Sequence, residues 1–129
     1  NMYGSQGVQA YAQVDLQSRV QSASPHQLVT MLFDGAHSAL VRARILMEKG
    51  DVAARGQAIT KAINIIDNGL RASLDHEKGG EISLDLEQLY DYMTRSLMRA
   101  NLHNEIDTLL HVDELLMGIS DAWKQIAPN

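Results

Sequence analysis

The chain has 129 residues, which suits one domain able to bury roughly two-thirds of its unfolded surface. It contains no cysteine, which excludes a disulfide framework and a thiolate metal site. The formal net charge of −5 argues against a nucleic-acid partner, because nucleic acids bind basic faces. No apolar run is long enough to insert into a membrane, and the polar N-terminus lacks a signal pattern, so we expect a cytoplasmic protein.

Residues 1–23 are predicted to form a tail that is distinct from the domain after it. This polar tail contains a small apolar pair, Val8 and Tyr11, and its second half contains Leu16 and Val20. Those two are four residues apart, which is typical of a short helix. We expect this N-terminal tail or short helix to fold over a bundle that occupies residues 24–129.

The first long helix of the bundle is predicted from Ser24 to Gly50. Ser24 is the expected N-cap, Pro25 follows at the first helical position, and Gln27 completes a capping box. Lys49 in the last turn and Gly50 after it are typical of a helix end. The core stripe is expected at Leu28, Leu32, Gly35, Ala39, Ala43 and Leu46.

The second helix is predicted from its Asp51 cap to about Leu74. Its apolar residues recur at steps of three or four and so form one stripe: Ile59, Ile63, Ile66 and Leu70. Ile65 lies about 100° off that stripe and must pack elsewhere. Residues 75–80 are rich in glycine and interrupt the pattern.

The third helix is predicted to start between Glu81 and Ser83 and to end near Leu102. The fourth is predicted to run from an Asn104 cap to Pro128. The expected core stripe of the third helix, flanked by Tyr90 and Tyr92, is Ile82, Leu86, Leu89, Met93 and Leu97. The expected core stripe of the fourth helix is Ile106, Leu109, Val112, Leu116, Ile119, Trp123 and Ile126. Trp123 is expected to be largely buried. Short connections between helices of about 20 residues make neighbours antiparallel. We therefore predict an all-α fold, an antiparallel up-down four-helix bundle.

Among the apolar residues off the predicted core stripes, we single out five: Ile65, Leu74, Tyr92, Leu110 and Met117. Each one alone is as well explained as an edge-of-core residue, since folded proteins expose much apolar surface. Together they indicate apolar surface beyond what one core face needs. Grooves between helices that receive an amphipathic client helix would use such residues.

Several segments resemble those of the flagellin export chaperone family, and the resemblance extends over residues 2–128. They are GVQAYAQV in the tail, SASPHQLVTMLFDGA, INIIDNGL, HEKGGEI, LYDYM and, near the end, AWKQIAP. Members of this family are cytoplasmic four-helix bundles that bind the disordered C-terminal segment of flagellin and prevent its premature polymerisation. They also help to deliver flagellin to the export gate of the flagellar type III apparatus, and some bind the flagellar anti-sigma factor.

The resemblance also gives Val8 and Tyr11 a role. In the family the matching tail lies over the bundle and takes part in partner binding. Such an intramolecular plug is present at high effective concentration and hides apolar surface that would otherwise aggregate. The implied partner-binding residues are therefore Val8, Tyr11, Ile65, Leu74, Tyr92, Leu110 and Met117.

An enzymatic activity is not expected. The sequence has five histidines but no Glu-x-x-His pair of the kind that di-iron bundles use. Asp34 with His37, and Asp107 with His111, fall mainly on polar faces, where solvated side chains are the simpler explanation. No strand precedes a glycine-rich phosphate loop. We expect no catalytic residue, no metal and no cofactor.

Two other interpretations stay open at this point. A histidine phosphotransfer domain is also a small acidic four-helix bundle, with His37 exposed mid-helix and Arg44 two turns away to steady a phosphate. A homodimeric helical scaffold would instead bury the off-stripe residues against a second copy.

Overall fold

The computed structural model describes residues 13–128, and within that range the chain is helical with no strand. A short helix spans residues 13–22. It is followed by α2 (Pro25–Lys49), α3 (Val52–Asn64), η1 (Ile65–Arg71), α4 (His76–Gly79), α5 (Glu81–His103) and α6 (Ile106–Gln125). This confirms the predicted all-α class. None of the helices in the described range is long and apolar enough to cross a membrane.

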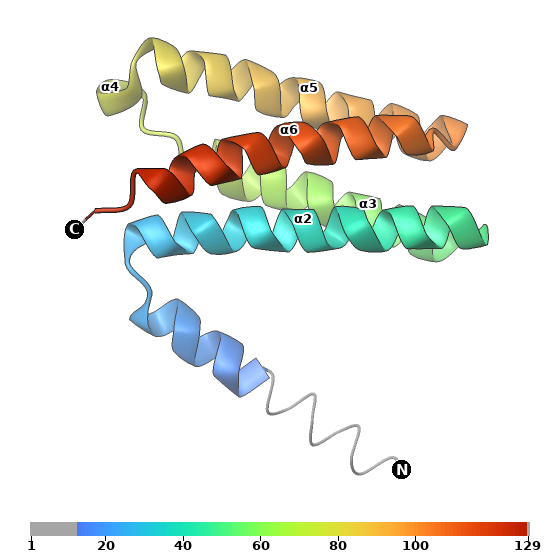
Figure 1. The fold of residues 1–129 in the computed structure, drawn as a ribbon, viewed down its shortest axis with the longest axis horizontal. Helices are drawn as coiled ribbons and strands as arrows, with labels where there is room; N and C mark the ends of the chain where they lie inside the picture. The colour runs from blue at the N-terminus through green and yellow to red at the C-terminus, as the bar shows by residue number, and fades with distance from the viewer. Residues whose placement is uncertain (1–12, 129) are drawn as a thin grey trace.

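The long helices form a four-membered bundle (Figure 1). Helix α2 packs on α3 and on α6, whereas α5 packs on α6 and on the continuous pair of α3 and η1. The pair α2–α3 therefore lies on one side of the bundle and the pair α5–α6 on the other. Consecutive long helices are antiparallel, as their short connections require.

The ends of α2 follow the sequence prediction. The Ser24 hydroxyl accepts from the Gln27 amide at 3.1 Å, and the Gln27 side chain accepts from the Ser24 amide at 2.8 Å. Gly50 adopts a left-handed conformation with φ of 75°, and its amide bonds back to the last turn. Both ends of this helix are thus fixed by local sequence.

The second predicted helix is correct in its Asp51 cap but not in its continuity. The Asp51 carboxylate accepts from the Ala54 amide at 3.2 Å. After Asn64 the backbone widens into the π-helical segment η1, which ends at Arg71, before the predicted end of the helix at Leu74. Such wide turns are uncommon and carry no strong sequence signature, which is why apolar spacing did not reveal this one.

The prediction that Asn104 caps the fourth helix is wrong. Asn104 has φ of 57° and ends α5, and Glu105 precedes α6 without a side-chain cap. The side chain of Asn104 accepts instead from Arg55 Nη1 at 2.6 Å. The same guanidinium donates to the side chain and the carbonyl of Asn101 at 3.2 and 3.0 Å. This cluster ties α3 to the end of α5.

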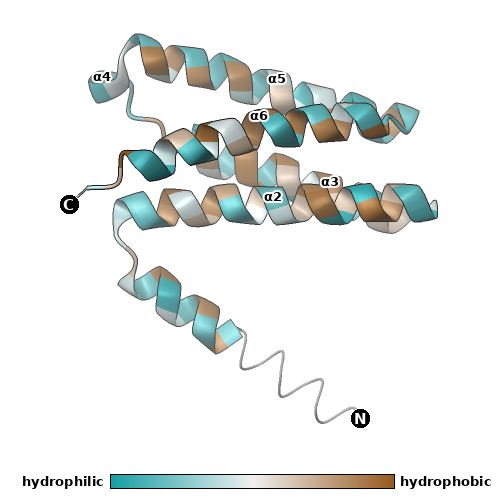
Figure 2. Ribbon diagram, in the orientation of Figure 1, coloured by the Kyte–Doolittle hydropathy of each residue, from teal (hydrophilic) through white to brown (hydrophobic). Residues whose placement is uncertain are grey.

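The core runs through the centre of the four helices, and brown apolar bands recur along each of the long helices (Figure 2). Its fully enclosed large side chains include Phe33, Ile59, Met93, Leu97 and Leu116. On α2 the buried face is offset from the predicted stripe, because Leu28 is exposed. Tyr90, predicted to flank the stripe of α5, is instead 3% exposed, and burial raises its pKa to about 12.

The described part of the N-terminal tail does not cover the bundle. Residues 13–22 form a helix that points away from the start of α2 (Figure 1), and all of them are exposed. Val8 and Tyr11 lie outside the described residues. The expected folding of the tail over the bundle therefore stays a prediction for the residues that precede this helix.

Candidate functional site: an apolar groove between α5 and α6

An open groove of about 740 Å³ lies between α5 and α6. It is lined by Ile82, Leu86 and Leu89 from α5 and by His111, Glu114, Leu115, Gly118, Ile119, Ala122, Trp123 and Ile126 from α6 and its end. Nine of these eleven side chains are apolar or absent, and only His111 and Glu114 bring polar groups. An open apolar trough on two helices is the geometry that receives an amphipathic helix.

Six of these residues were predicted to be core, and that prediction is wrong for the two exposed ones, Ile82 and Ile126, and only partly right for the other four. Ile82 is 69% exposed, Ile126 is exposed, and Leu86, Leu89, Ile119 and Trp123 are only partly buried. Helical spacing shows that residues share one face, but it does not show whether another helix covers that face. On α5 the predicted core stripe is fully buried only at Met93 and Leu97, in the half of the helix nearer to the connection with α6.

The first half of α5 is fixed to the other side of the bundle by Glu87. One oxygen of its carboxylate accepts from Arg71 Nη2 at 3.0 Å, and the other lies 3.1 Å from His76 Nε2. Ser83 adds a hydrogen bond of 2.8 Å to the carbonyl of Asp75. These contacts attach the start of α5 to η1 and α4. The side of α5 that lines the groove is therefore left open at this end of the helix.

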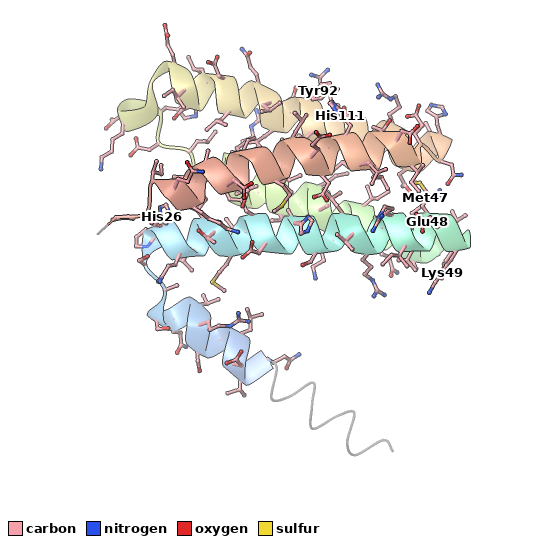
Figure 3. The ribbon with its side chains drawn as sticks, in the orientation of Figure 1. His26, Met47, Glu48, Lys49, Tyr92 and His111 are labelled. Carbon is pink, nitrogen blue, oxygen red and sulfur yellow. The ribbon has the colours of Figure 1, made fainter. Side chains whose placement is uncertain are left out.

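Trp123 forms the wall of the groove at the C-terminal end of α6. Its indole N–H donates to the His26 carbonyl at 3.1 Å, and the two rings stack with centroids 4.3 Å apart. The prediction that Trp123 is largely buried is therefore only half right. One face packs on the start of α2 (His26 is labelled in Figure 3), while other atoms line the groove.

His111 and Tyr92 mark the opposite end of the groove. The two rings meet edge to face with centroids 6.3 Å apart and face each other from α6 and α5 (Figure 3). Tyr92 does not itself line the groove, but it is exposed directly beside a residue that does. At 41% exposure, Tyr92 presents part of its side chain to solvent beside that end of the groove.

Gly118 leaves the middle of the α6 wall of the groove without a side chain. A methyl group added there would meet no atom within 4 Å, so the glycine leaves free space and is not needed for packing within the bundle. Ala122 lies one turn later on the same face. Two small residues at this spacing let the backbone of another helix approach closely.

The other predicted partner-binding residues lie around the bundle and not in the groove. Leu110 lines a small hollow between α2 and α6, and Ile65 lines an open one beside α2 and η1. Leu74 is partly buried against the core, and Met117 is partly buried on α6. None of them lines the groove between α5 and α6, and their role in binding stays a prediction.

Among residues 13–128 no three His, Asp or Glu side chains come together as a metal site. His37, the candidate for phosphotransfer, lies with Nδ1 2.7 Å from Asp113 and so joins α2 to α6. Arg44, the cation that the phosphotransfer interpretation requires near His37, lines the same hollow as His37.

Comparison with known proteins places this chain in one family. Residues 7–129 match the family model described as flagellar protein FliS. The chain is 61% identical over 128 residues to the flagellar secretion chaperone FliS of Salmonella typhimurium, covering 99% of this chain and 95% of that protein. It is 51% identical over 124 residues to that of Escherichia coli K12, covering 96% and 91%. It is 33% identical over 109 residues to that of Bacillus subtilis, covering 84% and 80%. The chain therefore belongs to the FliS family of flagellar proteins.

Proposed function

We propose that this chain is a cytoplasmic export chaperone that holds the disordered C-terminal segment of flagellin as amphipathic helices on its bundle. Holding that segment prevents premature polymerisation and keeps flagellin competent for delivery to the flagellar type III export gate. The resemblance extends the proposed partners to the export gate protein and to the flagellar anti-sigma factor. The chain acts through binding, without a catalytic group or a cofactor.

The observation that supports this proposal most directly is the apolar groove between α5 and α6. Its α6 wall runs from His111 to Ile126, about 22 Å at 1.5 Å per residue. That length matches four turns of a client helix. Gly118 allows close approach in the middle, while Trp123 and Ile82 offer large apolar contacts at one end.

The energetic requirement also fits a long groove. Ordering a disordered client costs on the order of 2–5 kcal/mol or more. A long apolar contact, on the order of 1,000 Å² or more, must offset that cost. The groove alone supplies only part of a contact area of this size, so we expect the client to continue over further surface of the bundle. Ile65, Leu74, Tyr92, Leu110 and Met117 are the proposed continuation.

The tail completes the proposal. Residues 1–23 act as a cap separate from the bundle of residues 24–129, with Val8 and Tyr11 docked on apolar surface until a client displaces them. Removing the residues before Val14 should leave the bundle folded and alter partner binding. Unchanged affinity for every flagellar partner after this truncation would make the tail a linker.

Co-purification tests the function itself. The chain is mixed with intact flagellin and, in parallel, with flagellin that lacks its C-terminal segment. We expect a 1:1 complex with the first and none with the second. Equal retention of both flagellins would contradict the proposed client segment, and retention of neither would contradict the chaperone function.

A phosphotransfer control separates the other class of function. Incubation with a phosphorylated response-regulator receiver domain, an acyl-phosphate donor, should leave His37 unlabelled. Family membership gives this alternative no support. A phosphorylated chain that loses its label in His37→Gln would reinstate it.

A further inference from the structure

The charges of this bundle are divided between its two sides. Helices α2 and α3 together hold five Lys and Arg residues against two acids, and α3 holds no acid at all. Helices α5 and α6 hold three bases against eight acids. An acidic chain with a net charge of −5 therefore presents one basic side.

The bases of this side are not used in ion pairs. Five Lys and Arg residues elsewhere in the described range form salt bridges with carboxylates: Arg19, Arg71, Arg95, Arg99 and Lys124. On α2 and α3 no Lys or Arg has a carboxylate within 4.0 Å among residues 13–128. Arg55 is buried in its own cluster, whereas Arg42, Lys49 and Lys61 are exposed.

Apolar and small residues lie between these cations. One hollow of about 610 Å³ on the outward side of α2 is lined in part by Val41, Ile45 and Lys49. A second of about 300 Å³ lies over α2 and α3, with Ala54, Ala58 and Lys61 in its lining. Ser38 and Arg42 line both hollows, so the two are contiguous.

We propose that this basic face, defined by Ser38, Val41, Arg42, Ile45, Lys49 and Lys61, is a second docking surface that binds an acidic amphipathic helix of another protein. The apolar side of that helix lies on Val41 and Ile45 over the small residues of α2 and α3. Its flanking carboxylates pair with Arg42, Lys49 and Lys61. Charge complementarity sets the register and the association rate, and the apolar strip supplies the buried area.

A protein helix fits this face better than a nucleic acid does. Ile45 is 41% exposed in the middle of the face and would gain nothing against a phosphate backbone. Three exposed cations around an apolar strip make few phosphate contacts, whereas nucleic-acid sites neutralise many. The alternation of apolar strip and charged rim is that of a helix-binding surface.

The basic face and the groove can be occupied together. Helices α2 and α3 lie on the side of the bundle opposite to the pair α5–α6, because neither α2 with α5 nor α3 with α6 forms one of the main packing contacts. A client segment held in the groove therefore leaves the basic face accessible to an acidic partner, whereas a client that continues over Ile65 or Leu110 reaches hollows that Lys61 and Val41 also line. Such a bridging role goes beyond holding the client.

Residue-resolved NMR tests this with defined probes. Two 18-residue helical peptides share one leucine stripe, and the first has Glu at every flanking position where the second has Lys. We expect the Glu peptide to shift the amide signals of Ser38, Arg42, Ile45 and Lys61, with and without client in the groove. The Lys peptide should leave these signals in place. Equal shifts from both peptides, or shifts confined to α5 and α6, would overturn the proposal.

Charge-reversal variants provide the matched control. Arg42→Glu combined with Lys61→Glu should weaken binding of the Glu peptide on the order of tenfold or more, because both cations are at its rim. Ile45→Asp should weaken it similarly, by removing the apolar strip. Lys78→Glu, the same change at an exposed cation away from this face, should have no effect.

Two further outcomes would assign the face to another occupant. A single-stranded oligonucleotide that shifts the same amides more strongly than the Glu peptide would identify a nucleic-acid site. Self-association of the free chain in sedimentation, lost in Arg42→Glu with Lys61→Glu, would identify a second copy. Circular dichroism establishes that each variant is folded, so that every result bears on the face.

Discussion

The indole N–H of Trp123 donates to the carbonyl of His26 at 3.1 Å, and the two rings stack nearly parallel, 11° apart. This contact fixes the C-terminal end of α6 to the start of α2. Because Trp123 also lines the groove, the same residue anchors α6 and forms part of the groove wall.

Trp123 should report directly on occupancy of the groove. It is the only tryptophan in the chain and is partly exposed when the groove is free. Binding of a client peptide that contains no tryptophan should shift the fluorescence emission of Trp123 to the blue. Trp123→Phe should keep the stacking but lose the hydrogen bond to His26, at a cost of about 1 kcal/mol in unfolding free energy. Binding without any emission change would show that the client lies elsewhere.

Arg55 should be essential for stability although it pairs with no carboxylate. Its buried guanidinium donates to Asn101 and Asn104, which hold the end of α5. Arg55→Lys should lower the free energy of unfolding by roughly 2 kcal/mol, because hydrogen bonds to a charged group are strong and an ammonium cannot reproduce the planar fork. Urea unfolding measures this, with the exposed Arg42→Lys as control. Equal stability of the two variants would contradict a structural role for the cluster.

Two helical glycines should respond oppositely to alanine. Gly118→Ala meets no neighbour within 4 Å and should stabilise the chain by up to about 1 kcal/mol through helix propensity. At Gly69 the new methyl would lie 3.0 Å from a Leu32 methyl, so Gly69→Ala should give no gain or a loss. Thermal unfolding of the two variants compares them. A stabilised Gly69→Ala would show that Leu32 moves aside without cost.

Tyr90 should make the fold sensitive to alkali. Burial raises its pKa from 10.0 to about 12, so the folded state keeps the proton longer than the unfolded state does. This contribution is fully present below pH 10 and is lost as pH rises through the window from about 10 to 12, by roughly 2 to 3 kcal/mol. Tyr90→Phe lacks the ionisable group, so its loss of stability across that window should be smaller. Parallel stability profiles for both proteins would contradict the assignment.

The sequence predicts the helices of this fold better than it predicts what covers them. Caps at Ser24, Asp51 and Gly50 are local, so residues close in sequence determine them. By contrast, Asn104 has two roles compatible with its chemistry, and a distant partner, Arg55, decides between them.

The candidate site was misread for the same reason. Ile82 and Trp123 have the spacing of core residues, and periodicity cannot show that the start of α5 is attached by Glu87 to η1 and α4. Off-stripe residues such as Tyr92 are visible from sequence as exposed apolar groups. The groove is instead lined by eleven residues of which six lie on the predicted stripes and are left without full cover.

Calorimetric titration of the flagellin C-terminal segment into three versions of this chain tests the central claim most directly. Ile82 is 69% exposed in the groove and Leu102, on the same helix but outside it, is 77% exposed, so neither aspartate should unfold the bundle. We predict a large negative heat-capacity change for the unmodified chain. Ile82→Asp should weaken binding by about tenfold to a hundredfold, or about 1.4 to 2.8 kcal/mol, and Leu102→Asp should not. Equal affinities of the two variants, or a heat-capacity change near zero, would contradict the groove between α5 and α6 as the client site.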